Sequence, residues 1–191
     1  MATLSARLAS GNPHKLEELR AVLAGWELEL LDTAEPYPPE TGATYEDNAR
    51  GKAAFGRPRA PADAWVLGED SGIEVDALGG APGIHSARYG GAESGKQRLL
   101  RELARVDDRR ARYVCTIVAI SPEGDEVVVR GTLAGEVALD ERGDEGFGYD
   151  PIFVPDGETQ TVAELGNDWK RRHSHRARAA AALVSALSAA P

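Results

Sequence analysis

Residues 64–70 read AWVLGED, an apolar run that ends in two adjacent acids, Glu69 and Asp70. The apolar residues are typical of a buried strand, and we expect that strand to end at the acids. In α/β proteins, ligands bind at the edge formed by the carboxyl ends of the strands. Adjacent carboxylates repel each other, and oxygen ligands without a companion cysteine favour Mg²⁺ over zinc. The stretch therefore predicts a magnesium site, with a turn of solvated acids as the alternative.

The composition is that of an ordinary globular chain. It has 191 residues, of which 42% are hydrophobic, so we expect one domain over residues 1–191, or two lobes that share one sheet. The net charge of −9 argues against non-specific nucleic-acid binding. We expect no membrane span and no signal peptide. The single cysteine, Cys115, lies in an apolar run and fits a cytoplasmic protein with a buried thiol.

Predicted strands and helices alternate along the first half of the chain, and two strands then form a hairpin. This order predicts an α/β fold with a mixed, twisted sheet flanked by helices. We expect strands at 4–9, 26–31, 64–70, 112–121 and 126–139, and helices at 12–25, 44–55, 94–106 and 174–189.

The segment SGNPHK, residues 10–15, joins the first strand to the first helix. Asn12 is a good N-cap and Pro13 suits the first helical position. Backbone N–H groups at a helix start attract anions, and Lys15 in the first turn opposes the helix dipole. A bound phosphate would remove that conflict. The alternative is an ordinary turn with an exposed lysine.

A second polar group stands in ETGATYEDNARGK, residues 40–52. Thr44 and Asp47 form a predicted capping box, and Lys52 lies one helical turn after Asn48 on the same face. The carboxylate of Glu40 in the preceding loop, the carboxamide of Asn48 and the ammonium of Lys52 would together suit a metal–phosphate complex. A solvated amphipathic helix is the alternative.

Two later segments suggest contacts with a ligand. GFGYDPIF, residues 146–153, places Phe147 and Tyr149 in a glycine-lined loop, where a ring can stack on a base or simply fill the core. KRRHSHRAR, residues 170–178, collects five Lys and Arg residues and two histidines. An anionic or electron-rich ligand would explain this concentration of positive side chains, and a solvated basic patch is the alternative. The spacing of His173 and His175 argues against a metal there.

Taken in order, these segments resemble the inosine triphosphate pyrophosphatase family, the Ham1/RdgB-like enzymes that hydrolyse triphosphates of deaminated purines. The resemblance covers almost the whole chain, from LASGNPHKLEEL to SHRARAA. It implies hydrolysis of XTP, ITP and dITP to the monophosphate and pyrophosphate, with Mg²⁺ as cofactor. It also implies a homodimer and an elongated, two-lobed α/β fold related to the Maf proteins, with the active site in a cleft between the lobes.

The resemblance also implies roles for individual residues. Asp70 would be the catalytic base, and Glu40, Glu69 and Asp70 would be the metal ligands. The usual pair is Asp-Asp, so Glu69 departs from the family pattern while keeping the charge. The residues implied to bind substrate are Ser10, Gly11, Asn12, Pro13, His14, Lys15, Lys52, Ser71, Arg88, Phe147, Gly148, Tyr149, Asp150, Lys170, His175 and Arg176.

Two other functions fit parts of the sequence. One is a Maf-like pyrophosphatase for modified pyrimidine nucleotides, against which the paired aromatics and the SHR segment argue. The other is a nucleotide-binding module without activity, against which the intact acids and lysines argue.

Overall fold

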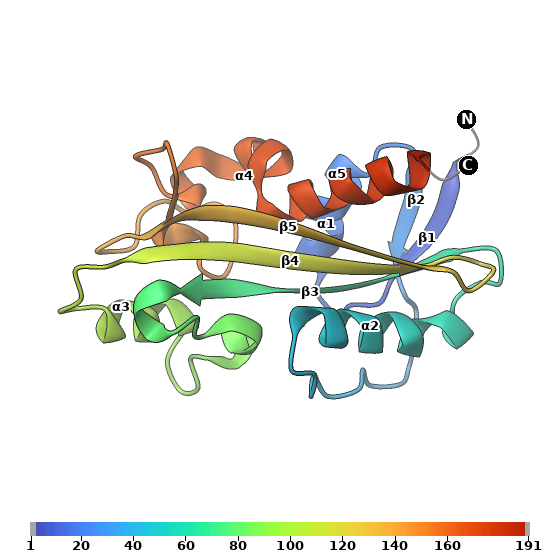
Figure 1. Ribbon diagram of the computed structural model, residues 1–191, viewed down its shortest axis with the longest axis horizontal. Helices are drawn as coiled ribbons and strands as arrows, with labels where there is room; N and C mark the ends of the chain where they lie inside the picture. Colours follow the sequence, from blue (N-terminus) through green and yellow to red (C-terminus); the bar gives the residue numbers. More distant parts are fainter. Residues whose placement is uncertain (1–2, 190–191) are drawn as a thin grey trace. The chain divides into compact units, whose positions relative to one another are not determined.

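The computed structural model describes residues 3–189, so residues 1, 2, 190 and 191 of the predicted domain lie outside the described part (Figure 1). Six strands form one sheet in the order β2-β1-β3-β4-β5-β6. The strands are β1 Leu4–Leu8, β2 Trp26–Leu30, β3 Trp65–Val75, β4 Arg110–Ile120, β5 Glu126–Val137 and β6 Phe153–Pro155. The α-helices are α1 Pro13–Val22, α2 Tyr45–Gly56, α3 Gly95–Glu102, α4 Val162–His173 and α5 His175–Ser188. Short 3₁₀ helices cover Arg57–Arg59, Asp76–Leu78, Gly83–Arg88 and Asp150–Ile152.

The sheet is mixed, as the sequence predicts. Strand β1 runs parallel to both β2 and β3, whereas β5 and β6 are antiparallel. The α/β class is therefore confirmed. No helix within residues 3–189 combines the length and the hydropathy that crossing a bilayer requires.

The chain divides into two compact units. Unit 1 contains residues 3–70, 115–131 and 176–189 of the described part, and unit 2 contains residues 71–114 and 132–175. Strands β3, β4 and β5 each contribute residues to both units.

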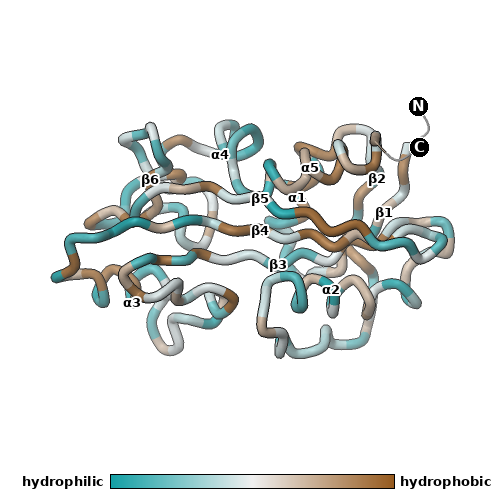
Figure 2. The backbone as a smooth tube through the Cα atoms, viewed as in Figure 1, coloured by the Kyte–Doolittle hydropathy of each residue, from teal (hydrophilic) through white to brown (hydrophobic). Residues whose placement is uncertain are grey.

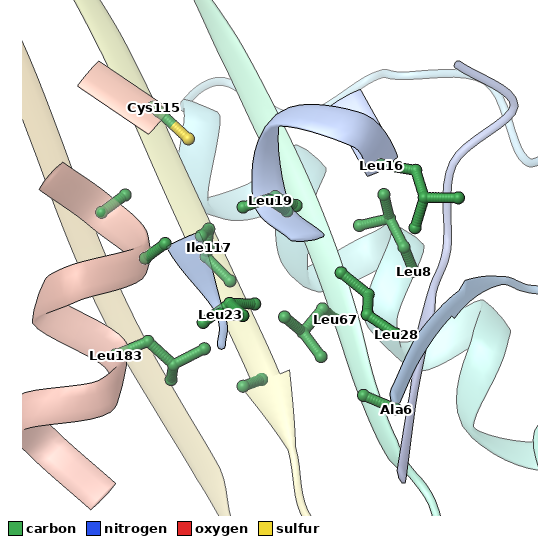
Figure 3. Close-up of a cluster of buried hydrophobic side chains, with 13 residues drawn as sticks. Ala6, Leu8, Leu16, Leu19, Leu23, Leu28, Leu67, Cys115, Ile117 and Leu183 are labelled. Carbon is green, nitrogen blue, oxygen red and sulfur yellow. The ribbon is translucent and has the colours of Figure 1, made fainter. Parts of the chain in front are cut away.

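The largest apolar cluster of unit 1 lies on one face of its sheet. Leu16, Leu19 and Leu23 of the α1 segment pack with Leu67 and with Leu183 of α5 (Figure 3). The neighbouring strand residue Val66 belongs to another cluster, because successive side chains of a strand point to opposite faces. Helix α2 covers that opposite face (Figure 1). Figure 2 shows the apolar stretches of β4 and β5 that pass through this unit. Helices thus flank both faces of the sheet in unit 1.

Unit 2 has a separate core. Ile73 and Val75 of β3 pack with Leu99 of α3, Tyr113 of β4 and Phe153 of β6. The alternating buried and exposed residues of β5 contribute Leu133 and Val137 to the same cluster.

Side-chain caps start helices α1 and α2 at the predicted positions. Asn12 Oδ1 accepts a hydrogen bond from the His14 backbone N–H at 3.0 Å, and α1 begins at Pro13. Thr44 and Asp47 form the predicted capping box of α2. These caps satisfy N–H groups that have no partner within the helix.

Several predicted boundaries are wrong. Strand β3 does not end at Asp70 but continues to Val75. Helix α1 ends at Val22, before the predicted Gly25, and α3 ends at Glu102. Two elements were not predicted from the sequence: strand β6, and helix α4, which begins after Thr161.

Gly68 of β3 provides a test of how the sheet meets α2. A Cβ atom at Gly68 would lie 1.9 Å from the Ala49 carbonyl oxygen and 2.7 Å from the Ala53 nitrogen. Because these are backbone atoms of a helix, they cannot move aside alone. We expect Gly68→Ala to lower the free energy of unfolding by about 3 kcal/mol or more in urea denaturation.

The matched control is Gly51→Ala on the exposed side of α2, where an added Cβ meets nothing within 4 Å. Alanine favours a helix over glycine, so this variant should gain about 0.5–1 kcal/mol. Equal stability of the two variants would contradict the close approach at Gly68.

Candidate active site

Glu69 and Asp70 lie inside β3, so their side chains point to opposite faces of the sheet. Glu69 contacts Lys15 of α1 and Arg176 of α5, whereas Asp70 contacts Asn48 and Lys52 of α2. The adjacent acids therefore belong to two separate clusters, both made of residues of unit 1.

The first cluster, here called the Asp70 cluster, consists of Glu40, Asn48, Lys52 and Asp70. Lys52 Nζ lies 2.5 Å from Glu40 Oε1 and 2.9 Å from Asp70 Oδ1. It also donates to the Glu69 carbonyl oxygen at 3.0 Å, which accounts for the three donors of an ammonium group. Asn48 Nδ2 donates to Asp70 Oδ2 at 3.1 Å. The structure thus brings together the carboxylate, carboxamide and ammonium that the sequence pattern grouped.

Asp70 is buried, and this shifts its acidity. Burial raises the pKa of Asp70 above its ordinary value, although the Lys52 ammonium and the Asn48 amide act in the opposite direction. Burial also disfavours the charge of Lys52, but Asp70 and Glu40 outweigh it and raise the pKa of that ammonium. A carboxylate with a raised pKa binds a proton more readily than an exposed aspartate does.

The second cluster, here called the Glu69 cluster, consists of Lys15, Glu18, Glu69, Cys115 and Arg176. Lys15 Nζ lies 2.5 Å from Glu69 Oε2. Arg176 donates to Glu69 Oε1 from Nη2 at 3.0 Å and from Nε at 3.2 Å, and to Glu18 Oε2 from Nη1 at 2.6 Å. The Cys115 thiol donates to Glu69 Oε1 at 3.3 Å. Two cations and two carboxylates are therefore packed together.

The charges of this cluster fix its protonation. Burial alone would raise the pKa of Glu69, but Lys15 and Arg176 outweigh it and hold that pKa well below its usual range. Burial raises the pKa of the Cys115 thiol well above its ordinary value, and the charge of Glu69 adds to the effect. Cys115 accordingly stays a protonated structural thiol.

The three predicted metal ligands do not form one group. Glu40 and Asp70 both contact Lys52, but Glu69 lies on the other face of β3. Within residues 3–189, no three His, Cys, Asp or Glu side chains are arranged to hold a metal ion.

The predicted phosphate segment folds as a capped turn. Ser10 is half-buried, and its Oγ accepts from the Asn12 N–H at 3.1 Å. Gly11, Pro13 and His14 are exposed. Lys15 belongs both to this segment and to the Glu69 cluster, and 15% of its side chain is exposed to solvent.

The aromatic segment belongs to unit 2. Lys170 Nζ lies 4.5 Å from the centre of the Phe147 ring and 2.7 Å from Asp150 Oδ2. The same oxygen accepts from the Phe147 N–H at 2.8 Å. Tyr149 is buried, and its hydroxyl donates to the Ser86 carbonyl at 2.8 Å. Phe147 is half-buried beside exposed Gly148, so Asp150 and Lys170 together fix a partly accessible ring.

The remaining predicted residues lie elsewhere in the two units. His175 is buried and stacks on Tyr113 with ring centres 4.6 Å apart. Arg88 is exposed, and its Nη2 lies 2.9 Å from His85 Nδ1. Ser71 is half-buried in β3, directly after Asp70.

Residues 6–186 match the family model described as the Ham1 family. The chain belongs to the Ham1 family. This confirms the resemblance that the five segments carry in the sequence, and the match spans both units.

Known Ham1-family relatives are similar over nearly their whole length. A Deinococcus deserti protein named dITP/XTP pyrophosphatase is 44% identical over 184 residues, covering 94% of this chain and 87% of its own. An Opitutus terrae protein of the same name is 46% identical over 198 residues, covering 95% and 97%. The solved structure of the Staphylococcus aureus Ham1 protein has a TM-score of 0.84 and 35% identity, covering 96% of this chain and 98% of that chain.

Three residues of these clusters were not among the predicted site residues. The sequence pattern groups Asn48 with Glu40 and Lys52 but gives it no individual role; in the structure it joins Asp70 to the loop through a hydrogen bond from the Gly42 N–H at 2.9 Å. Glu18 lies three residues after Lys15, a spacing that places both on one helical face. Nothing in the sequence around Cys115 indicates its contact with Glu69.

The buried pair of Asp150 and Lys170 predicts a stability effect in unit 2. Both side chains are almost fully buried, with 6% and 3% exposed. Asp150→Asn removes the negative charge facing the ammonium, and we expect it to lower the free energy of unfolding by about 3 kcal/mol, measured by urea denaturation.

The matched control is Asp168→Asn, which removes a carboxylate that is 83% exposed and pairs with Arg171 at 3.0 Å. Exposed pairs contribute little, so we expect a change below about 0.5 kcal/mol. A similarly small change for Asp150→Asn would show that the buried pair does not stabilise unit 2.

Proposed function

We propose that this chain hydrolyses XTP, ITP and dITP to the nucleoside monophosphate and pyrophosphate, and so removes deaminated purines from the nucleotide pool. Membership of the Ham1 family and the names of the relatives support this reaction. The observation that carries the proposal is the Asp70 cluster, in which a buried carboxylate with a raised pKa meets an ammonium and a second carboxylate.

Asp70 is the proposed base. Water attacks the α-phosphorus, a new P–O bond forms, and the bond between the α-phosphorus and the bridging oxygen breaks to release pyrophosphate. The Asp70 carboxylate accepts a proton from the attacking water, and Asn48 and Lys52 hold both of its oxygens in place.

Mg²⁺ is the proposed cofactor. Glu40 and Asp70 are the donor set that fits it, because Mg²⁺ is usually held by one or two carboxylates together with substrate phosphates. Glu69 is not part of this donor set, because it is completely buried and lies on the other face of β3 from Asp70. When bound, Mg²⁺ would neutralise phosphate charge and stabilise the leaving pyrophosphate.

The other predicted residues divide into two proposed roles. We assign the phosphates to residues 10–15 and to Lys52, since Lys15 is a partly exposed cation in the first turn of α1. We assign the base to Phe147, which would stack on the purine, and to Lys170, whose ammonium would face its carbonyl oxygen. Tyr149, Asp150, His175, Arg176, Arg88 and Ser71 remain proposed substrate residues from the resemblance.

A homodimer and a cytoplasmic location are also proposals that rest on the resemblance. Light scattering on the purified protein tests the first, because a monomer mass would contradict it.

A substrate panel tests the reaction. The protein is incubated with Mg²⁺ and ITP, XTP, dITP, ATP, GTP or dTTP, and pyrophosphate and phosphate are measured separately. We expect pyrophosphate from the first three, loss of the activity on adding EDTA, and its return with excess Mg²⁺. Phosphate without pyrophosphate would contradict attack at the α-phosphorus, and equal rates with GTP and ITP would contradict the role in removing deaminated purines.

Asp70→Asn tests the role of the base. The amide keeps the size of the side chain but cannot accept the proton, so we expect kcat to fall at least about 1,000-fold. Binding of substrate should remain measurable by calorimetry, because Lys15 and the base contacts are unchanged. Loss of binding with normal residual turnover would reassign Asp70 to substrate binding.

A further inference from the structure

Glu69 is completely buried, with 0% of its side chain exposed. A carboxylate in that position is stable only if its charge is balanced by groups inside the protein. Lys15 contacts one of its oxygens, and Arg176 and Cys115 contact the other. Within residues 3–189, Oε1 therefore accepts hydrogen bonds, whereas Oε2 is held by the ion pair with Lys15 alone.

The two cations come from different helices. Lys15 is in the first turn of α1, and Arg176 is in the first turn of α5. Positive charges at these positions oppose the helix dipoles and repel each other. Glu69 separates them and attracts both, and Glu18 adds a second carboxylate on Arg176. The four charges sum to zero, so the arrangement is balanced without a metal ion.

Lys15 differs from its partners in exposure. Its side chain is 15% exposed, whereas that of Arg176 is 3% exposed. An ammonium has three donors, and the contact with Glu69 uses one of them. Lys15 can thus stay bound to Glu69 and still donate to an anion that arrives from solvent.

We propose that Glu69 is a positioning residue that fixes Lys15 and Arg176 for the reaction, and not a metal ligand. The proposal rests on the proposed hydrolysis of a triphosphate. Glu69 acts through Lys15, which it anchors at the start of α1, and does not itself touch substrate.

A double-mutant cycle tests this. Lys15→Met is made in the wild-type protein and in Glu69→Gln, and kcat/KM with ITP is measured in all four proteins. We expect Lys15→Met to cost about tenfold in the wild-type background and less than about threefold in Glu69→Gln, because a lysine that is no longer held contributes little. Equal costs in both backgrounds would overturn the proposal.

Two further readouts separate positioning from metal binding. Glu69→Gln should lower kcat/KM with ITP by about the same tenfold as Lys15→Met, because it acts through the placement of Lys15. The Mg²⁺ concentration for half-maximal rate should stay unchanged in Glu69→Gln and rise in Glu40→Gln. A rise in both variants would make Glu69 a metal ligand and overturn the proposal.

Glu29→Gln is the matched control, because Glu29 pairs with Arg7 at 3.2 Å and is 53% exposed. We expect Glu29→Gln to leave both kcat/KM with ITP and the Mg²⁺ concentration for half-maximal rate unchanged. Thermal unfolding checks that each variant is folded. If Glu69→Gln does not fold, Glu69→Asp is used in its place, because aspartate keeps the negative charge. We expect Glu69→Asp to need the same Mg²⁺ concentration for half-maximal rate as the wild type. A higher concentration would again overturn the proposal.

Binding of inorganic tripolyphosphate in EDTA separates this proposal from the proposed function. It requires neither turnover nor metal, so it can be measured by calorimetry even if no nucleotide of the panel is hydrolysed. The expected result is again about a tenfold loss on Lys15→Met in the wild-type background and less than about threefold in Glu69→Gln. Equal losses would overturn the positioning role whatever the enzyme hydrolyses.

Discussion

The ion pair between Glu69 and its two cations is the constraint around which unit 1 is organised. A fully buried carboxylate cannot keep its charge unless partners replace the water it has lost. Here the partners are Lys15 and Arg176, which belong to helices at opposite ends of the chain. Their contacts therefore tie α1 and α5 to β3 at a defined point, in addition to the leucine packing that those helices share.

The alternation of side chains along β3 extends this constraint to the other face. Because Asp70 follows Glu69 directly, its side chain points to the opposite face, toward α2. There Asn48 and Lys52 donate hydrogen bonds to its carboxylate. One strand thus carries the charge-balanced Glu69 cluster on one side and, on the other, the Asp70 cluster for which the hydrolysis is proposed. Displacement of β3 along its axis would disturb both clusters together.

Local spacing made part of this arrangement predictable from the sequence. Asn48 and Lys52 are one helical turn apart, and that spacing alone places them on one face. The end of β3 was not predictable in the same way, because adjacent acids indicate a surface turn unless their partners are known. Those partners are distant: Arg176 is 107 residues from Glu69 along the chain, and no periodicity connects them.

Helix α4 shows a different reason for failure. Thr161 and Glu164 carry the capping-box pattern that marks a helix start, and the structure contains that box. Gly166 follows with a positive φ of 82°, so the helical pattern is interrupted just after it begins. The start signal was present in the sequence, but the regular apolar spacing needed to recognise the helix was not.

The close approach at Gly68 has a consequence for how this protein can diverge. Helix α2 rests on β3 through backbone atoms, since the position of a Gly68 Cβ would lie against the Ala49 carbonyl. The distance between helix and strand is consequently set by the main chain and not by the sizes of the surrounding apolar side chains. Core side chains of unit 1 can therefore change in size while the spacing of Asn48 and Lys52 from Asp70, and with it the chemistry proposed for Asp70, is retained.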